Sequence, residues 1–228
     1  MGKTQTSIQK EWYSDVKARY SLSLAEKNNE MHLKRLKELL DNGKIDGPVL
    51  EIGCSSGWYS GKFGPTTYAV DISIKGIRKE TNFVVADAEQ LPFRNNTFGL
   101  VYGFGIIHHL EDIDKGFREA YRVLKPEGRI AFGAENNAFC PANYIFPFIY
   151  GNWHVEKGFT RLTKDNIQGK LLGMGFTDHR FGYGGFAVYG MNRTVYEITK
   201  KIENILSKSP SIHKMAGFMY FTAKKLQS

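Results

Sequence analysis

The chain has 228 residues, of which 42% are apolar, 14% aromatic and 24% charged, and its formal net charge at pH 7 is +8. This composition is typical of a globular protein and excludes a disordered chain or a bundle of membrane-spanning helices. The length favours one domain with one hydrophobic core. The two cysteines, Cys54 and Cys140, have neither metal-ligand spacing nor a disulfide framework, so we expect no metal site and a reducing, cytoplasmic location.

The positive charge is concentrated in the last third of the chain. Residues 1–47 hold 9 basic and 7 acidic side chains, residues 48–135 hold 10 and 11, and residues 136–228 hold 12 and 5, which leaves +7 on the last segment. A local basic field favours an anionic partner such as phosphate, nucleic acid or an acidic membrane surface. The alternative is a solvated surface that keeps the protein in solution.

The first part of the chain predicts helices, and the part after Pro48 predicts alternating strands and helices. Apolar residues between positions 7 and 42 recur with helical spacing until Asn42-Gly43, so we interpret residues 1–44 as an N-terminal helical cap. Helical patterns at 58–63, 75–79 and 114–124 then separate the β-rich runs PVLEIGC, TTYAVDI, NFVVAD, FGLVYGF and RIAFGAEN. This alternation predicts an α/β fold with a parallel sheet covered by helices on both faces.

The final third is less regular. Residues 136–160 are aromatic and broken by prolines, too irregular for a core helix, whereas residues 163–174 predict a helix. A glycine- and aromatic-rich segment at 182–191 precedes an amphipathic pattern at 192–208, and AGFMYFTAKK predicts the last strand. No repeat or low-complexity linker marks a second domain. We therefore interpret residues 136–160 and 182–213 as insertions that form the substrate side of one domain, 1–228.

Three predicted strands end in acidic or glycine-rich segments that suit a nucleoside. Glu51 precedes a turn with Gly53 and Gly57, and such a turn lets a ligand approach the backbone closely. Asp71 follows at the distance where a second parallel strand presents a carboxylate to ribose hydroxyls. Asp87 ends the third strand and can accept a hydrogen bond from an adenine amine. The glycine pattern differs from the dinucleotide fingerprint and no phosphate-binding lysine follows, so a nucleoside without phosphates is predicted.

Five segments together resemble a known family. EIGCSSG, AVDIS, VVADAEQLPF, NTFGLVYGFGIIHHLED and EAYRVLKPEGRIAF resemble, in order and spacing, the class I S-adenosylmethionine-dependent methyltransferases, especially the small-molecule group with the ubiquinone and menaquinone C-methyltransferases. The resemblance covers residues 45–135 and 160–180. It implies S-adenosyl-L-methionine as cofactor and a Rossmann-like seven-stranded sheet in the order 3-2-1-4-5-7-6, with strand 7 antiparallel.

The resemblance also implies roles for individual residues. Glu51 would orient the loop and the amino group of the cofactor, Asp71 would bind the ribose, and Ile72 would pack on the adenine. The other cofactor-binding residues that it implies are Gly53, Cys54, Ser55 and Gly57 beside the methionine part, Asp87 and Ala88 at the adenine edge, and Gly103 and Phe104 near the sulfonium. Two features depart from the family: Ser55 replaces a more usual glycine, and only fifteen residues separate Asp71 from Asp87.

The sequence does not identify a catalytic base. Methyl transfer from a sulfonium needs an acceptor held in line with the methyl group, and a base only where the acceptor must lose a proton. His109, with His108 beside it, follows the fourth strand and His154 lies in the first insertion, so His109 and His154 are the candidates. The alternatives are a packing role for the histidine pair and an exposed loop position for His154.

Aromatic residues from the cap and the first insertion suggest an apolar acceptor. Trp12, Tyr13, Tyr20, Tyr150 and Trp153 are the substrate-side candidates, and the alternative is that they only pack the cap and insertion onto the sheet. The apolar run 145–150 would also suit peripheral contact with a membrane-linked lipid. We therefore predict a methyltransferase for a small-molecule or lipid-linked acceptor. An RNA or protein methyltransferase and a non-catalytic S-adenosylmethionine-binding protein are the alternatives, and the oligomeric state stays open.

Overall fold

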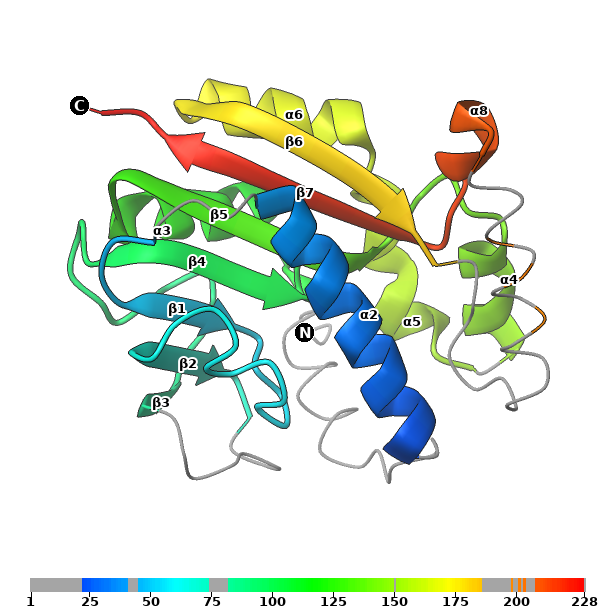
Figure 1. The fold of residues 1–228 in the computed structure, drawn as a ribbon, viewed down its shortest axis with the longest axis horizontal. Helices are drawn as coiled ribbons and strands as arrows, with labels where there is room; N and C mark the ends of the chain where they lie inside the picture. The colour runs from blue at the N-terminus through cyan, green and yellow to red at the C-terminus, as the bar shows by residue number, and fades with distance from the viewer. Residues whose placement is uncertain are drawn as a thin grey trace, which may run out of the picture.

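The computed structural model describes residues 22–40, 45–73, 82–149, 151–185, 198, 201, 203 and 208–227 (Figure 1). Seven strands form one sheet in the order β3-β2-β1-β4-β5-β7-β6. Their bounds are β1 Val49–Ile52, β2 Thr67–Asp71, β3 Asn82–Val85, β4 Phe98–Phe104, β5 Leu124–Asn136, β6 Phe176–Gly184 and β7 Phe218–Lys225. β1 to β5 pair in parallel, and β7 is antiparallel to both β5 and β6. The predicted strand order and the antiparallel strand 7 are confirmed.

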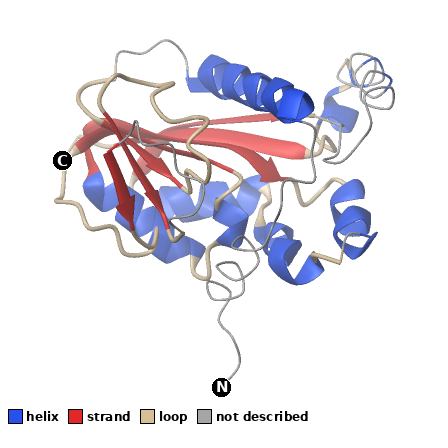
Figure 2. Cartoon of the chain, turned by 90° about the horizontal axis from the view of Figure 1, so that it is seen from below, coloured by secondary structure: helices blue, strands red, loops and turns tan. Residues whose placement is uncertain are grey.

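Helices cover both faces of this sheet. α2 (Leu22–Leu40) lies across one face, and α3 (Ile113–Val123) and α6 (Lys164–Gly173) lie on the other (Figure 2). α2 confirms helical structure in the second half of the predicted N-terminal helical cap, and residues 1–21 of that cap lie outside the described residues. α3 and α6 confirm the helices predicted at 114–124 and 163–174. None of the helices in the described ranges combines the length and apolarity needed to cross a membrane.

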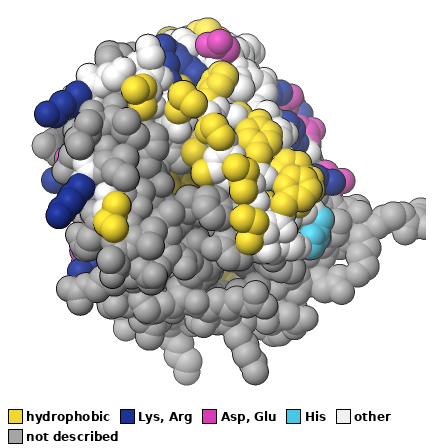
Figure 3. All heavy atoms as spheres, turned by 90° about the vertical axis from the view of Figure 1, so that its right-hand side faces the viewer, with side chains coloured by type: hydrophobic (Ala, Val, Ile, Leu, Met, Phe, Trp, Pro, Cys, Tyr) yellow, Lys and Arg dark blue, Asp and Glu magenta, His cyan; other side chains and the backbone are white. Residues whose placement is uncertain are grey.

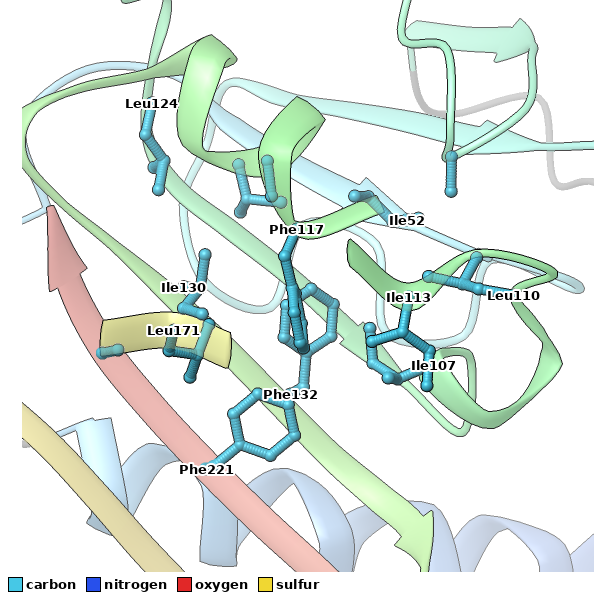
Figure 4. Packing of buried hydrophobic residues seen from close by; sticks show 14 of the residues in the cluster. Ile52, Ile107, Leu110, Ile113, Phe117, Leu124, Ile130, Phe132, Leu171 and Phe221 are labelled. Carbon is cyan, nitrogen blue, oxygen red and sulfur yellow. The ribbon is translucent and has the colours of Figure 1, made fainter. Parts of the chain in front are cut away.

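The larger core lies between the sheet and α3. Asp112 caps this helix by accepting a hydrogen bond from the Lys115 amide at 3.0 Å. The buried positions of α3 recur at helical spacing on one face, so that Phe117 points into the sheet. Its ring centroid lies 6.2 Å from that of Phe132 on β5 and 6.0 Å from that of Phe221 on β7 (Figure 4). The side chains of central strands and α3 thus hold the strand ends in fixed positions.

A smaller core lies under α2. Leu36 and Leu40 are buried against Leu100 and Tyr102 of β4 and Tyr220 of β7. His32 lies in the same layer, where its Nδ1 is 2.5 Å from the Tyr220 hydroxyl. Burial lowers the pKa of His32 to about 3, with the Arg35 charge adding to the effect, so the imidazole is neutral. α2 is therefore docked by apolar packing and one buried polar contact.

The helix predicted at 58–63 is wrong, because turns occupy this segment. Gly57 and Gly61 have φ values of 73° and 78°, which interrupt a right-handed helix. Two aromatic side chains of this segment pack on β4. The Tyr59 ring stacks on Phe104 with centroids 3.7 Å apart, and the Phe63 ring lies 4.5 Å from that of Tyr102. The helix predicted at 75–79 lies outside the described residues.

The last third is more ordered than the sequence suggested. Residues 136–160 include the short helices α4 (Ala142–Ile149) and α5 (Trp153–Glu156), followed by the 3₁₀ helix η2 (Lys157–Arg161). Residues 182–184 belong to β6 rather than to an insertion, because they pair with β7. The helix α8 is Pro210–His213, and the 3₁₀ helix η1 (Ile107–His109) follows β4. The helix predicted at 192–208 lies almost entirely outside the described residues.

Candidate functional site

A pocket opens beyond the carboxyl ends of the central parallel strands. Three chain segments line it: the end of β1, the end of β2, and the turn after β3. η1 closes its remaining side. The lining residues are Ile52, Gly53, Val70, Asp71, Ile72, Ala86, Asp87, Ala88, Glu89, Ile106, His109 and Leu110. This edge of a parallel α/β sheet is where ligands of such folds bind.

The backbone after β1 turns sharply into the pocket. Gly53 has φ of 70°, and a Cβ at this position would lie 2.8 Å from the Ile106 side chain. Only glycine fits there without strain or a shift of Ile106. The Gly53 amide donates to the Val70 carbonyl at 2.8 Å, which ties this turn to β2. Ser55 has φ of 45°, so it adopts the left-handed conformation that glycine adopts at lower cost.

Asp71 connects the strand ends to one another. Its Oδ2 accepts a hydrogen bond from the Ser55 amide at 2.8 Å, and its Oδ1 accepts one from the Ser73 amide at 2.9 Å. The Ala86 amide donates to the Asp71 carbonyl at 3.0 Å, which brings the end of β3 beside that of β2. Because a carboxylate offers about four acceptor positions, Asp71 retains capacity for two further donors such as vicinal hydroxyls.

The turn after β3 is held by two carboxylates. Asp87 Oδ1 accepts from the Glu89 amide at 2.8 Å, which folds the turn back on itself. Glu89 is buried, and its Oε1 accepts from the Glu111 amide at 2.7 Å and the Asp112 amide at 3.1 Å. These bonds fasten the turn to the segment that leads into α3. The adenine-edge candidates are therefore positioned by backbone bonds at both ends.

Glu51 lies beneath the glycine turn rather than on the pocket wall. Its carboxylate is 1% exposed and accepts hydrogen bonds from the Ser60 hydroxyl and, at 3.2 Å, from the Tyr102 hydroxyl. Burial raises the pKa of Glu51 to about 7; the two hydrogen bonds oppose this shift, and the charge of Asp71 adds to it. A cation near this carboxylate would offset the cost of its burial.

The structure brings five of the predicted cofactor residues to the pocket wall. These are Gly53, Asp71, Ile72, Asp87 and Ala88. The other six, Glu51, Cys54, Ser55, Gly57, Gly103 and Phe104, do not line it. Gly103 still matters to the wall, because a Cβ there would lie 2.7 Å from the Ile52 carbonyl oxygen and 2.8 Å from Ile106. Burial raises the pKa of the Cys54 thiol, which keeps it protonated and unreactive.

Sequence reasoning missed several lining residues. Ile52, Val70 and Ala86 each stand next to a predicted cofactor-binding residue. Their place at the end of an apolar run was the sequence signal that could have identified them. Glu89, Ile106 and Leu110 follow the predicted strands by several residues. They lie within the family-like segments VVADAEQLPF and NTFGLVYGFGIIHHLED, so the resemblance was the available signal, but the turn after β3 and η1 decide that they reach the pocket. The apolar residues that were missed supply most of the apolar wall on which a flat ring system would pack; they are Ile52, Val70, Ala86, Ile106 and Leu110.

The two histidine candidates occupy different environments. His109 is 7% exposed and lines the pocket, and burial lowers its pKa to about 3, with the charge of His108 acting in the same direction. A neutral imidazole with so low a pKa is a weak proton acceptor at pH 7. His154 is exposed on α5 and does not line this pocket. The structure therefore supports neither His109 nor His154 as a catalytic base.

Of the five substrate-side candidates, only Trp153 lies within the described residues. Its ring stacks on Phe148 with centroids 4.6 Å apart and meets the Phe159 ring edge-on at 6.0 Å. This packing joins α4 to α5 and η2. Trp12, Tyr13, Tyr20 and Tyr150 lie outside the described residues.

The chemistry of the pocket fits a cationic nucleoside without phosphates. Within the described residues, its lining combines apolar side chains for a ring with three acids, Asp71, Asp87 and Glu89, and includes no lysine or arginine. With His109 neutral, the lining is negative in a protein whose net charge is +8. A pyrophosphate would be repelled by such a lining, whereas a ligand with sulfonium and ammonium charges would be attracted. Free acceptor positions on Asp71 match a ribose diol.

Comparisons with known proteins agree with this geometry. Residues 50–132 match the family described as "Methyltransferase domain". The methyltransferase GfsG of Streptomyces halstedii is 31% identical over 99 residues, which are 36% of each chain. The ubiquinone/menaquinone biosynthesis C-methyltransferase UbiE of Brucella canis is 50% identical over 56 residues, 24% of this chain and 20% of UbiE. The matched segments therefore span about a third or less of these relatives.

A solved structure extends the likeness over most of the fold. It is a methyltransferase of Thermotoga maritima described as S-adenosylmethionine-dependent and as a possible histamine N-methyltransferase. It superposes with a TM-score of 0.60 and 18% identity, covering 85% of this chain and 86% of its own. At this identity the comparison supports the shared fold.

Proposed function

From a methyltransferase domain at residues 50–132 within a class I fold, we propose that this protein is an S-adenosylmethionine-dependent methyltransferase acting on a small-molecule or lipid-linked acceptor. The observation that carries the proposal is the junction of two strand ends, where the Ser55 amide donates to the Asp71 carboxylate at 2.8 Å beside the glycine turn. This junction forms a rigid, negatively charged edge that suits an adenosyl group and a sulfonium.

Five residues of the wall would hold the cofactor. Asp71 would accept hydrogen bonds from the ribose hydroxyls through its unused acceptor positions. Ile72 would pack on the adenine, and Asp87 with Ala88 would face its polar edge. Gly53 would allow the methionine part to approach the backbone. When bound, S-adenosylmethionine supplies a methyl group on a positively charged sulfur, and the protein contributes orientation and exclusion of water.

Glu51 would respond to the charge of the cofactor. With a pKa of about 7, this buried carboxyl group is partly protonated at neutral pH. A nearby ammonium favours the ionised form, so binding of the cation would release a proton from Glu51. The hydrogen bonds from Ser60 and Tyr102 would hold the carboxylate in place as it ionises.

An exposed apolar surface supports an apolar or lipid-linked acceptor. Figure 3 shows hydrophobic side chains gathered on the side of the molecule that carries α4. The exposed fractions are 55% for Ile145, 65% for Phe148 and 66% for Ile149, and Phe139 before α4 is 55% exposed. Clustered apolar side chains of this size mark a ligand or membrane contact more often than a bare protein surface. Such contact would be peripheral and, in our proposal, made from the cytoplasm.

The +7 charge of the last third favours an RNA or protein acceptor as the second candidate. Several of its described basic side chains already have partners. Lys170 pairs with Asp114 at 2.8 Å, Lys224 pairs with Glu127, and Lys225 is buried with its amine bonded to the Tyr121 and Leu124 carbonyls. This pairing reduces the field available to a nucleic acid. Salt-dependent retention on RNA would favour the second candidate, and its absence at low salt would count against it.

Substitution of Asp71 tests the cofactor site. Calorimetric titration with S-adenosylhomocysteine should show that Asp71→Ala loses about 100-fold or more in affinity, because two charge-assisted hydrogen bonds are lost at about 1.5 kcal/mol or more each. Asp165→Ala, which removes an exposed acid on α6, is the matched control and should bind S-adenosylhomocysteine with the affinity of the unsubstituted protein. Unchanged affinity of folded Asp71→Ala would refute the ribose assignment.

Transfer of label from S-adenosylmethionine with a tritiated methyl group tests the acceptor. We expect label in the small-molecule or organic-soluble fraction of a cell extract, and its appearance in RNA or protein would favour the second candidate. Cofactor binding without transfer to any fraction would indicate a non-catalytic binding protein. The Asp71→Ala protein, under the same conditions, gives the background of the assay.

A further inference from the structure

A buried cluster of histidines and carboxylates lies beside the cofactor pocket. η1 contributes His108 and His109, α5 contributes Glu156, and β5 contributes Glu135. One possible ligand atom from each of His108, His109 and Glu156 lies within 4.8 Å of the others. The side chains of His108, Glu135 and Glu156 are 4%, 0% and 16% exposed. No step of the proposed methyl transfer uses this cluster.

Glu135 fixes the orientation of His108. Its Oε1 accepts from the amides of Ile106 and Ile107 at 2.9 and 3.0 Å, so the carboxylate is anchored on the backbone at the start of η1. Its Oε2 lies 2.8 Å from His108 Nδ1, which places the ring proton on Nδ1. A carboxylate that accepts from one ring nitrogen of a histidine, leaving the other nitrogen free to coordinate, is the usual outer partner of a metal ligand.

The opposite nitrogen of His108 faces a second carboxylate. Its Nε2 lies 3.3 Å from Glu156 Oε2, which is also held by the Asn136 amide group at 3.0 Å. A neutral imidazole would present a lone pair to a carboxylate, so a cation must lie between them, either a proton or a metal ion. Charge-assisted N–H···O bonds are usually about 2.7–2.9 Å long, whereas two ligand atoms about 2.0–2.1 Å from a tetrahedral zinc ion are about 3.3 Å apart.

The charges of the cluster also favour a divalent ion. The ion pairs that the described residues form with Glu135 and Glu156 both come from His108. Two buried carboxylates with one imidazolium leave a net charge of −1, whereas two carboxylates, two neutral imidazoles and a divalent ion are balanced. Imidazole and carboxylate ligands together are typical of zinc and neighbouring transition metals rather than of magnesium or calcium.

We propose that His108, His109 and Glu156 bind a divalent transition-metal ion of the zinc type, with Glu135 as the residue that positions His108. The ion joins η1 to α5, which also contact each other through His108 and Glu156 and through a hydrogen bond of His109 with the Val155 backbone. η1 also packs closely on η2, since a Cβ on Gly158 of η2 would lie 1.8 Å from the His108 carbonyl oxygen. His109 also lines the cofactor pocket. The metal therefore fixes one wall of that pocket while leaving the methyl-transfer chemistry to the cofactor.

Metal uptake by the full-length protein tests the proposal directly. After dialysis against a chelator, we expect titration with Co²⁺ to give one equivalent of bound ion with visible ligand-field absorption, and Zn²⁺ to displace it. Zn²⁺ should also raise the midpoint of thermal unfolding. Failure of the original protein to take up a stoichiometric ion would overturn the proposal and would identify the cluster as a buried His108 imidazolium.

Variants locate the ion within the chain. His109→Gln and Glu156→Gln should each weaken Co²⁺ binding by more than about 100-fold, and Glu135→Gln by about 10- to 100-fold. His154→Ala on the same helix α5 is the matched control and should retain the affinity and the absorption spectrum. Full affinity in folded His109→Gln and Glu156→Gln, or equal loss in His154→Ala, would place the ion elsewhere. Far-UV circular dichroism checks that each variant is folded.

Discussion

Replacing the buried carboxyl group of Glu51 by an amide should change how stability depends on pH. Glu51 lies on β1, is 1% exposed, and has a pKa of about 7 against an ordinary value of 4.5, chiefly because burial disfavours its charge. In Glu51→Gln the side chain has nearly the same shape, and the amide oxygen can still accept from the Tyr102 hydroxyl. The substitution therefore removes the titration while keeping most of the packing.

The sign and size of this pH dependence follow from the pKa of Glu51 in the folded protein and in the unfolded chain. Between pH 4.5 and 7 the folded protein holds more protons at Glu51 than the unfolded chain does, so the free energy of unfolding falls as pH rises. This contribution is complete in acid below pH 4.5 and lost above pH 7. Between pH 5 and pH 8 the original protein should lose about 2.5 kcal/mol through this group, since each unit of pKa shift is worth about 1.4 kcal/mol.

Urea unfolding at pH 5 and pH 8 measures this effect. Between pH 5 and pH 8 the free energy of unfolding should fall by about 2.5 kcal/mol less in Glu51→Gln than in the unsubstituted protein, whatever the other groups contribute. Taking the difference between proteins cancels the other titrations. Equal pH dependence of the two proteins would show that Glu51 is ionised normally in the fold, and the reasoning on its burial would be refuted.

Three smaller predictions concern the backbone and one helix cap. Ser55→Gly should raise the free energy of unfolding by about 0.5 kcal/mol, because glycine adopts φ of 45° without the strain of serine, and this gain outweighs the added entropy of the unfolded chain. A lower free energy of unfolding in urea would contradict this. Asp112→Ala should lower it by about 1 kcal/mol through loss of the α3 cap, and an unchanged urea midpoint would exclude that role. Gly158→Ala should lower the free energy of unfolding by about 2–3 kcal/mol in the same assay. Gly169→Ala is the control and should not destabilise α6, because a Cβ at Gly169 meets no atom within 4 Å. Equal effects of the two substitutions would argue against close packing of η2 on His108.

The parallel half of the sheet was predictable because each strand has a local signal. The runs that end at Ile52, Asp71, Val85 and Phe104 are short, β-rich and bounded by turns, and their order follows from the motif resemblance. α3 was predictable to within one residue, since its apolar spacing and Asp112 cap are both local. The helix predicted at 58–63 was wrong because Gly57 and Gly61 have positive φ values and interrupt it, and the Tyr59 and Phe63 rings pack on β4 instead.

The sequence by itself determined the strands of the parallel half and the acids at their ends, because alternating patterns and turn residues act over a few neighbouring positions. The order of the strands in the sheet was implied by the family resemblance and not by these local patterns. Only the tertiary structure decided which of these residues share a wall. The Ser55 amide meets Asp71 sixteen positions later, and His108 meets Glu135 after twenty-seven. The first contact depends on the pairing of β1 with β2, and the second depends on how β4 and β5 place η1 at the edge of the sheet. No local pattern encodes that arrangement, since it results from packing of the whole core.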